Sequence, residues 1–206
     1  MSEAMPFGSR GGLAVQHQFP ADGEYSIRIR LQRNSRDYIR GLADPHQLDV
    51  RVDGERVQVF TVGGEKKGKT GPIYSQAAQI GDPLQEEYEH GGAEQNLEAR
   101  FNAKAGLHSV VVTFVAKTSV PEGLYLPPIN QFDNVQYKGG NPALDTVTIG
   151  GPFVVAGIGD TASRRKIFVC KPSGAADQEA CAQKILTTIG RRAYRRPLTA
   201  NDTSTR

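Results

Sequence analysis

The strongest constraint on the fold of this chain is an alternation of apolar and polar residues, repeated in short runs. In EYSIRIRLQ the residues Tyr25, Ile27 and Ile29 alternate with polar ones, and LDVRVDG and NLEARF repeat the pattern. Because successive side chains of a strand point to opposite faces, this pattern predicts sheets with one buried side and one solvent-facing side. The Asp53-Gly54 pair between two such runs predicts a tight hairpin, since both positions of a type I′ turn require positive φ.

The first 160 residues therefore predict a mainly β fold, a two-sheet sandwich of jelly-roll type. Short strands separated by turn residues are typical of two packed antiparallel sheets. After residue 160 the pattern changes: Cys181, Ile185 and Ile189 recur at four-residue spacing, which predicts a C-terminal amphipathic helix that ends before Pro197. We expect a β-sandwich domain over residues 1–160 and the truncated start of a helical domain over residues 161–206.

Charge is divided unevenly between the two parts of the chain. Residues 1–163 carry 15 Lys and Arg against 19 Asp and Glu, a net charge of −4, whereas residues 164–206 carry 10 against 3, a net charge of +7. The arginines of RRAYRRP could neutralise phosphates, but an acidic protein surface would pair with them equally well. We expect no nucleic-acid partner. We also expect no membrane span, because no apolar run approaches the ~18 residues that a spanning helix needs.

The two cysteines, Cys170 and Cys181, bracket a short loop before and inside the predicted helix. They form neither a CxxC nor a CxxCH motif, so neither a thioredoxin-type site nor a c-type haem site is indicated. Two interpretations remain, a pair of buried thiols or a disulfide that joins the loop to the helix. We favour the disulfide, which would contribute about 3 kcal/mol to stability and would indicate an oxidising compartment. The predicted location is periplasmic or extracellular, with a signal peptide expected upstream of this fragment.

Recognisable catalytic motifs are absent from the sequence. GxSxG, P-loop, HExxH and GxGxxG patterns do not occur, and the four histidines lie in separate segments. We predict that the chain is not an enzyme and holds no cofactor of its own, calcium excepted.

Aromatic side chains on loops are the candidates for glycan binding. Tyr74, Tyr125 and Tyr137 lie outside the alternating segments, and rings on loops bind ligands more often than rings in strands do. The absence of tryptophan, a favoured stacking platform, counts against this prediction, and these rings could instead cover the core.

Acidic residues at turns are candidate calcium ligands. Asp22 and Glu24 lie at the start of one predicted strand, and Asp53 lies in the hairpin. Calcium takes carboxylate and carbonyl oxygens from such turns. The alternative is that these carboxylates are simply solvated.

The closing block CKPSGAADQEACAQKILTTIGRRAYRRP, with PFGSRGGLAVQHQFPADGEYSIRIRLQR and PEGLYLPP before it, carries a family resemblance. The chain resembles an internal fragment of large secreted multidomain bacterial proteins associated with Planctomycete-type cytochrome c modules. The resemblance covers residues 6–202 and implies a sandwich similar to carbohydrate-binding modules, followed by the start of a helical domain of unknown function. A calcium-dependent xylan-binding type is one relative of such sandwiches. Haem is implied only for the parent protein, whose remaining domains would be partners of this part.

Two functions remain open. We expect a non-catalytic module that binds polysaccharide within a larger secreted or periplasmic protein. The alternative is a structural spacer or interaction domain without affinity for glycans.

Overall fold

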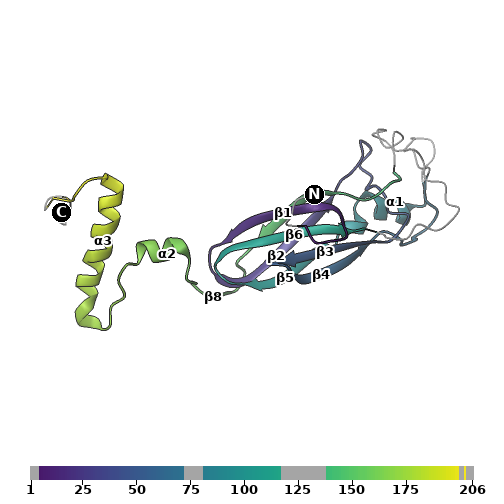
Figure 1. Cartoon of the computed structure of the whole chain (residues 1–206). Helices are drawn as coiled ribbons and strands as arrows, with labels where there is room; N and C mark the ends of the chain where they lie inside the picture. Colours follow the sequence, from purple (N-terminus) through teal and green to yellow (C-terminus); the bar gives the residue numbers. More distant parts are fainter. Residues whose placement is uncertain (1–4, 72–80, 117–137, 200–201, 203–206) are drawn as a thin grey trace. The chain divides into compact units, whose positions relative to one another are not determined.

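The computed structural model describes residues 5–71, 81–116, 138–199 and 202 of the chain. It contains two compact units, Met1–Gly157 (unit 1) and Ile158–Arg206 (unit 2). Unit 1 holds all the described strands and unit 2 holds two helices (Figure 1). None of the described helices is long and apolar enough to cross a membrane.

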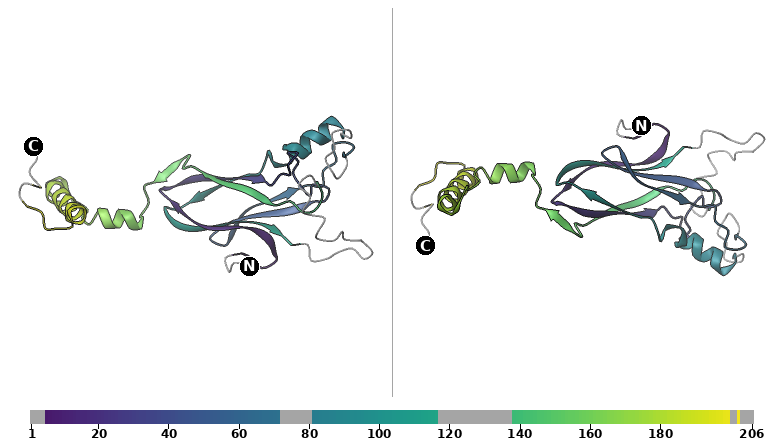
Figure 2. Two further views of the ribbon diagram at one scale, coloured as in Figure 1. Left: turned by 90° about the horizontal axis from the view of Figure 1, so that it is seen from above. Right: turned by 90° about the horizontal axis from the view of Figure 1, so that it is seen from below.

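Unit 1 consists of two antiparallel four-stranded sheets packed as two layers (Figure 2). The first sheet has the order β1-β6-β3-β4, with the bounds β1 Ser9–Phe19, β6 Gly106–Val115, β3 His46–Val52 and β4 Glu55–Val62. The second has the order β5-β2-β7, with β8 paired to the start of β2; their bounds are β5 Glu98–Ala103, β2 Asp22–Leu31, β7 Leu144–Gly150 and β8 Val155–Gly157. The predicted mainly β, two-sheet fold is thus confirmed, while its jelly-roll connectivity stays a prediction.

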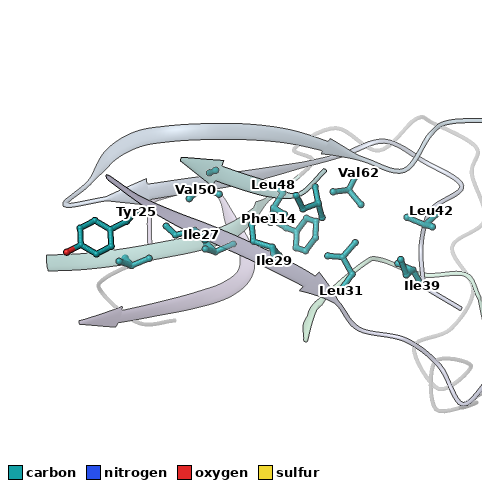
Figure 3. Close-up of a cluster of buried hydrophobic side chains, with 14 of the residues drawn as sticks. Tyr25, Ile27, Ile29, Leu31, Ile39, Leu42, Leu48, Val50, Val62 and Phe114 are labelled. Carbon is teal, nitrogen blue, oxygen red and sulfur yellow. The ribbon is translucent and has the colours of Figure 1, made fainter. Parts of the chain in front are cut away.

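The core lies between the two sheets and follows the alternation in the sequence (Figure 3). In β2 the inward residues Ile27 and Ile29 are fully buried, whereas Arg28 and Arg30, which alternate with them, are exposed. β6 runs through the middle of its sheet, and Val110–Phe114 are all buried, because an inner strand with a continuous apolar run can be covered on both faces. Close packing of such side chains supplies most of the stability of a domain of this size.

The tight hairpin is present between β3 and β4. Asp53 has φ 51° and Gly54 has φ 82°, the two positive values that a type I′ turn requires. The Asp53 carboxylate also accepts hydrogen bonds from the His108 ring and from the backbone N–H of Ser109. The turn is therefore held against β6 as well as closing its own hairpin.

A short helix, α1 (Pro83–His90), and the 3₁₀ turn η1 (Gly92–Glu94) lie between β4 and β5. α1 is found at the end of the sandwich away from the hairpin that joins β3 to β4 (Figure 1). Its buried side is mostly polar, because Gln85, Glu86 and Glu89 are buried along with Tyr88. A stripe of this composition has no apolar periodicity, so the sequence pattern does not indicate a helix here.

Unit 2 contains α2 (Ala162–Ile167) and α3 (Gln178–Tyr194). The predicted amphipathic helix is thus present, but among the described residues of this unit only Cys181 is buried. Asp177 occupies the N-cap position of α3 without a capping hydrogen bond, and its carboxylate instead accepts one from the Ser173 hydroxyl. The inward stripe predicted for α3 therefore has almost nothing to pack on within the described part of unit 2.

After α3 the chain turns back through Arg195, whose φ is 53°. Leu198 then lies against Gly190, where a Cβ would come within 2.8 Å of the leucine Cδ1. Arg196 closes the turn by pairing with Asp202 at 2.7 Å. Because Gly190 has no Cβ, Leu198 can approach α3 this closely.

Candidate functional site

One recess of unit 1 with ligand-like dimensions is a groove that we call the α1 groove. It has a volume of about 490 Å³ and lies where α1 and η1 meet the end of β4 and the chain leading into β5. Its lining includes Phe60, Thr61, Tyr88, Gln95, Asn96 and Leu97. Small-molecule pockets span about 300–1,000 Å³, so the groove is large enough for a ligand of a few rings.

The floor of the α1 groove is apolar. Leu97 and Tyr88 are buried, with exposed fractions of 4% and 7%, and Phe60 is half-buried beside them. Burial, with the nearby Glu65 carboxylate, raises the pKa of the Tyr88 phenol, so this side chain stays protonated at neutral pH. Leu84 on α1 adds an exposed aliphatic side chain at the margin.

The polar groups of the groove are two uncharged amides and a hydroxyl, together with three charged side chains, Glu65, Lys67 and Glu87. Gln95 and Asn96 are exposed, and their side-chain amides make no hydrogen bond to any other residue that the structure describes. An amide offers both a donor pair and an acceptor, so two adjacent amides can bind several hydroxyl groups at once. Lys67 and Glu65 at the margin pair with each other at 2.6 Å.

The segment that carries Gln95 and Asn96 is held in place by Glu94. The Glu94 carboxylate accepts hydrogen bonds from the backbone N–H of Leu31 at 2.7 Å and from the Arg33 guanidinium at 2.5 Å. The Arg33–Glu94 pair is mostly buried, with side-chain exposures of 21% and 10%. The amides are therefore presented from a backbone that is fixed to β2.

On the other side of α1, four side chains form what we call the α1 ionic cluster: Tyr38, Glu86, Glu89 and Lys138. The Lys138 ammonium donates to Glu89 at 2.8 Å, lies 3.6 Å from Glu86, and sits 3.7 Å from the centre of the Tyr38 ring. The Tyr38 hydroxyl donates to Glu86 at 2.5 Å. The three charged side chains are at most 11% exposed, so they are removed from water as a group.

The pKa values in the cluster follow from these contacts. Burial and the hydrogen bond to Glu86 raise the pKa of Tyr38 to about 12, which keeps the phenol a donor. Burial alone would raise the pKa of Glu86. The bonds from Tyr38 and from the Gly81 backbone N–H, together with Lys138, outweigh it and lower that pKa. Both carboxylates are engaged by donors, which suits a structural role in holding α1 on the sandwich.

The predicted calcium ligands each have a protein partner. Asp22 accepts from the Ala105 N–H at 2.7 Å and from Lys104 at 3.0 Å, and both bonds lower its pKa. Glu24 lies 3.6 Å from Arg100. Asp53 bonds His108 at 2.5 Å.

The structure does not bring these three carboxylates together as a metal site. Within the described residues, no group of three or more His, Cys, Asp or Glu side chains is placed to hold a metal ion. Calcium binding therefore stays a prediction, and it gains no support from the placement of Asp22, Glu24 and Asp53.

The predicted glycan-binding residues Tyr74, Tyr125 and Tyr137 lie outside the described residues, so their role stays a prediction. The residues that line the α1 groove were missed by sequence reasoning. Gln95 and Asn96 follow a Gly91-Gly92 pair and precede the buried Leu97, and this exposed amide pair beside a turn was the available signal.

The predicted disulfide between Cys170 and Cys181 is present, and the chain has no free cysteine. It joins the loop after α2 to the first turn of α3. Its presence is consistent with folding in an oxidising compartment.

The disulfide is open to a direct chemical test. Alkylation of the oxidatively folded chain without reductant is expected to add no mass, because both thiols are consumed. Alkylation after reduction serves as the control and should add two groups. Two modified thiols in the unreduced sample would show that the bond does not form. The chain would then lack the stabilisation of about 3 kcal/mol that loop closure is expected to give.

No protein-family model, no curated protein and no solved structure matches this chain. The functional argument therefore rests on the geometry of the chain itself.

Proposed function

We propose that unit 1 is a non-catalytic carbohydrate-binding module and that the glycan lies in the α1 groove. The observation that carries the proposal is the combination of an apolar floor with two exposed side-chain amides that have no hydrogen-bond partner among the described residues. A pyranose ring has an apolar face and a rim of hydroxyl groups. Apolar floors with a few placed polar groups are typical of sites that bind such ligands.

The charge of the groove favours a neutral polysaccharide. Its amides and the Thr61 hydroxyl are uncharged, and Glu65 and Lys67 at the margin neutralise each other. Because Glu65 and Lys67 pair with each other, neither charge is free to attract a charged glycan. The exposed Glu87 adds one negative charge to the lining, which disfavours an acidic glycan. The Cys170–Cys181 bond supports a periplasmic or extracellular setting, where polysaccharides are encountered.

Binding of the full chain to soluble xylan, glucomannan and mixed-linkage glucan tests the proposal, with calcium and again with a chelator. Saturable binding to at least one polymer is expected. The Gln95→Ala/Asn96→Ala double variant should weaken it about tenfold or more, because each lost hydrogen bond is worth about 0.5–1.5 kcal/mol. Gln16→Ala, an exposed amide on β1, is the matched control and should bind as the parent does.

The outcomes separate the alternatives. If no polymer binds, the chain is a spacer or interaction domain and the proposal is wrong. If a polymer binds and only Tyr74→Ala, Tyr125→Ala or Tyr137→Ala weakens it, glycan binding is right but its placement in the α1 groove is wrong.

A further inference from the structure

Unit 2 contains a second groove, formed between α2 and α3, that the proposed function does not use. This α2–α3 groove has a volume of about 530 Å³ and is lined by residues of unit 2 alone. The Cys170–Cys181 disulfide lies in its wall and ties the loop after α2 to the first turn of α3. A covalent bond thus links the two walls of the groove, and Cys181 is the one buried residue among those described in this unit.

The inner surface of the α2–α3 groove is apolar and uncovered. Phe168 is 50% exposed, Ala182 is exposed and Ile185 is half-buried. Ile167 and Val169, on either side of Phe168, are also exposed. Apolar surface of this kind, on a unit whose described residues include a single buried side chain, marks a place where another segment packs.

The rim of the same groove is positively charged. Arg164, Arg165 and Lys171 line it, against Asp160 as the one acidic residue among its described lining. Arg165 pairs with Asp160 at 3.0 Å, but both side chains are largely exposed, at 64% and 72%, so water screens the pair. The Arg164 guanidinium lies 4.5 Å from the centre of the Phe168 ring, where it presents its N–H groups beside the apolar surface.

From this juxtaposition we propose that the α2–α3 groove docks an acidic, amphipathic segment of a partner protein. An aliphatic or aromatic side chain of the segment packs on Phe168 and Ile185, and its carboxylates pair with the cations of the rim. Charge complementarity selects the partner, since residues 164–206 carry a net charge of +7. The inference is independent of glycan binding, which concerns unit 1.

A nucleic acid fits these observations less well. Its phosphates would find the rim cations but leave the apolar surface at Ile185 without a partner. The arginines of the RRAYRRP cluster do not extend the rim, because none of them lines the groove. Arg196 is instead paired with Asp202 at 2.7 Å. Arg192 donates to the Lys166 carbonyl at 3.0 Å.

Two fluorescein-labelled peptides of about 14 residues test the proposal. Both carry Leu and Phe at helical i, i+3, i+4 and i+7 spacing; one has Glu at the other positions and the second has Gln. Fluorescence anisotropy with the full, disulfide-intact chain should show binding of the Glu peptide. Binding should fall as salt rises from ~50 to ~300 mM and should be at least about tenfold tighter than that of the Gln peptide.

Two matched pairs of variants test whether the peptide binds in the α2–α3 groove. Each pair compares a position that lines the groove with one that lies outside it. Lys171→Glu in the rim should weaken binding about tenfold, while Lys184→Glu, the same charge change on the opposite side of α3, should change it less than about twofold. Ala182→Glu inside the groove should abolish binding, while Ala180→Glu outside it should not. All four positions are exposed, so helix content by circular dichroism should stay unchanged.

Several results would overturn the proposal. Equal losses for Lys171→Glu and Lys184→Glu would show unspecific attraction to a basic unit, and equal binding of the two peptides would remove the role of charge. A single-stranded oligonucleotide of equal charge that binds more tightly than the Glu peptide, and is insensitive to Ala182→Glu, would make the surface a nucleic-acid site instead.

Discussion

Replacing Lys138 with methionine is expected to destabilise unit 1 by about 3–5 kcal/mol, the usual cost of removing one partner of a buried ion pair. Lys138 is 8% exposed and lies between Glu86 and Glu89. Without its ammonium group, two carboxylates that are nearly excluded from water lose their shared cation. The free energy of unfolding of the full chain should be measured by denaturant titration with far-UV circular dichroism, since the chain has no tryptophan.

Two companion variants make the Lys138 result interpretable. Lys104→Met removes a lysine that pairs with Asp22 at 3.0 Å but is 83% exposed, so the denaturation midpoint should barely move. Lys138→Met combined with Glu89→Gln should recover part of the loss, because one uncompensated charge is also removed. Equal midpoints for Lys138→Met and Lys104→Met would show that the α1 ionic cluster does not stabilise the fold.

Replacing Leu48 with alanine is expected to cost a similar amount, about 2–5 kcal/mol, by leaving a cavity in the core. Leu48 is fully buried on β3, and its cross-strand partners are Phe114 on β6 and Phe60 on β4. Leu107→Ala on β6 is the matched control, because that leucine is 65% exposed and its truncation should cost less than about 0.5 kcal/mol. Equal losses at the two positions would contradict the placement of the core between the sheets.

The sandwich could be predicted from the sequence because its information is local. A strand buries every second residue, so Ile27 and Ile29 inside and Arg28 outside follow from the order of residues alone. The Asp53-Gly54 turn is local in the same way, since its geometry depends on two adjacent residues. The Cys170–Cys181 disulfide could also be predicted, because a chain with two cysteines allows one intramolecular pairing.

α1 and the groove beside it could not be predicted in that way. Glu86 and Glu89 look like residues of a solvated loop until Lys138, about fifty positions later, is brought against them. The α1 groove similarly joins Thr61 on β4 to Asn96 before β5. No periodicity in a single segment reports such pairings, because they depend on the tertiary fold.

Nuclear magnetic resonance mapping of the glycan site tests the central claim most directly. The isotope-labelled full chain would be titrated with soluble xylan first and then with the tightest-binding polymer of the screen, while backbone amide shifts are followed. Glycan binding in the α1 groove predicts saturable shifts concentrated at Thr61, Gln95, Asn96 and Leu97, with none at the Asp53-Gly54 hairpin. Unchanged spectra with every polymer, or shifts that leave these four residues unaffected, would contradict it.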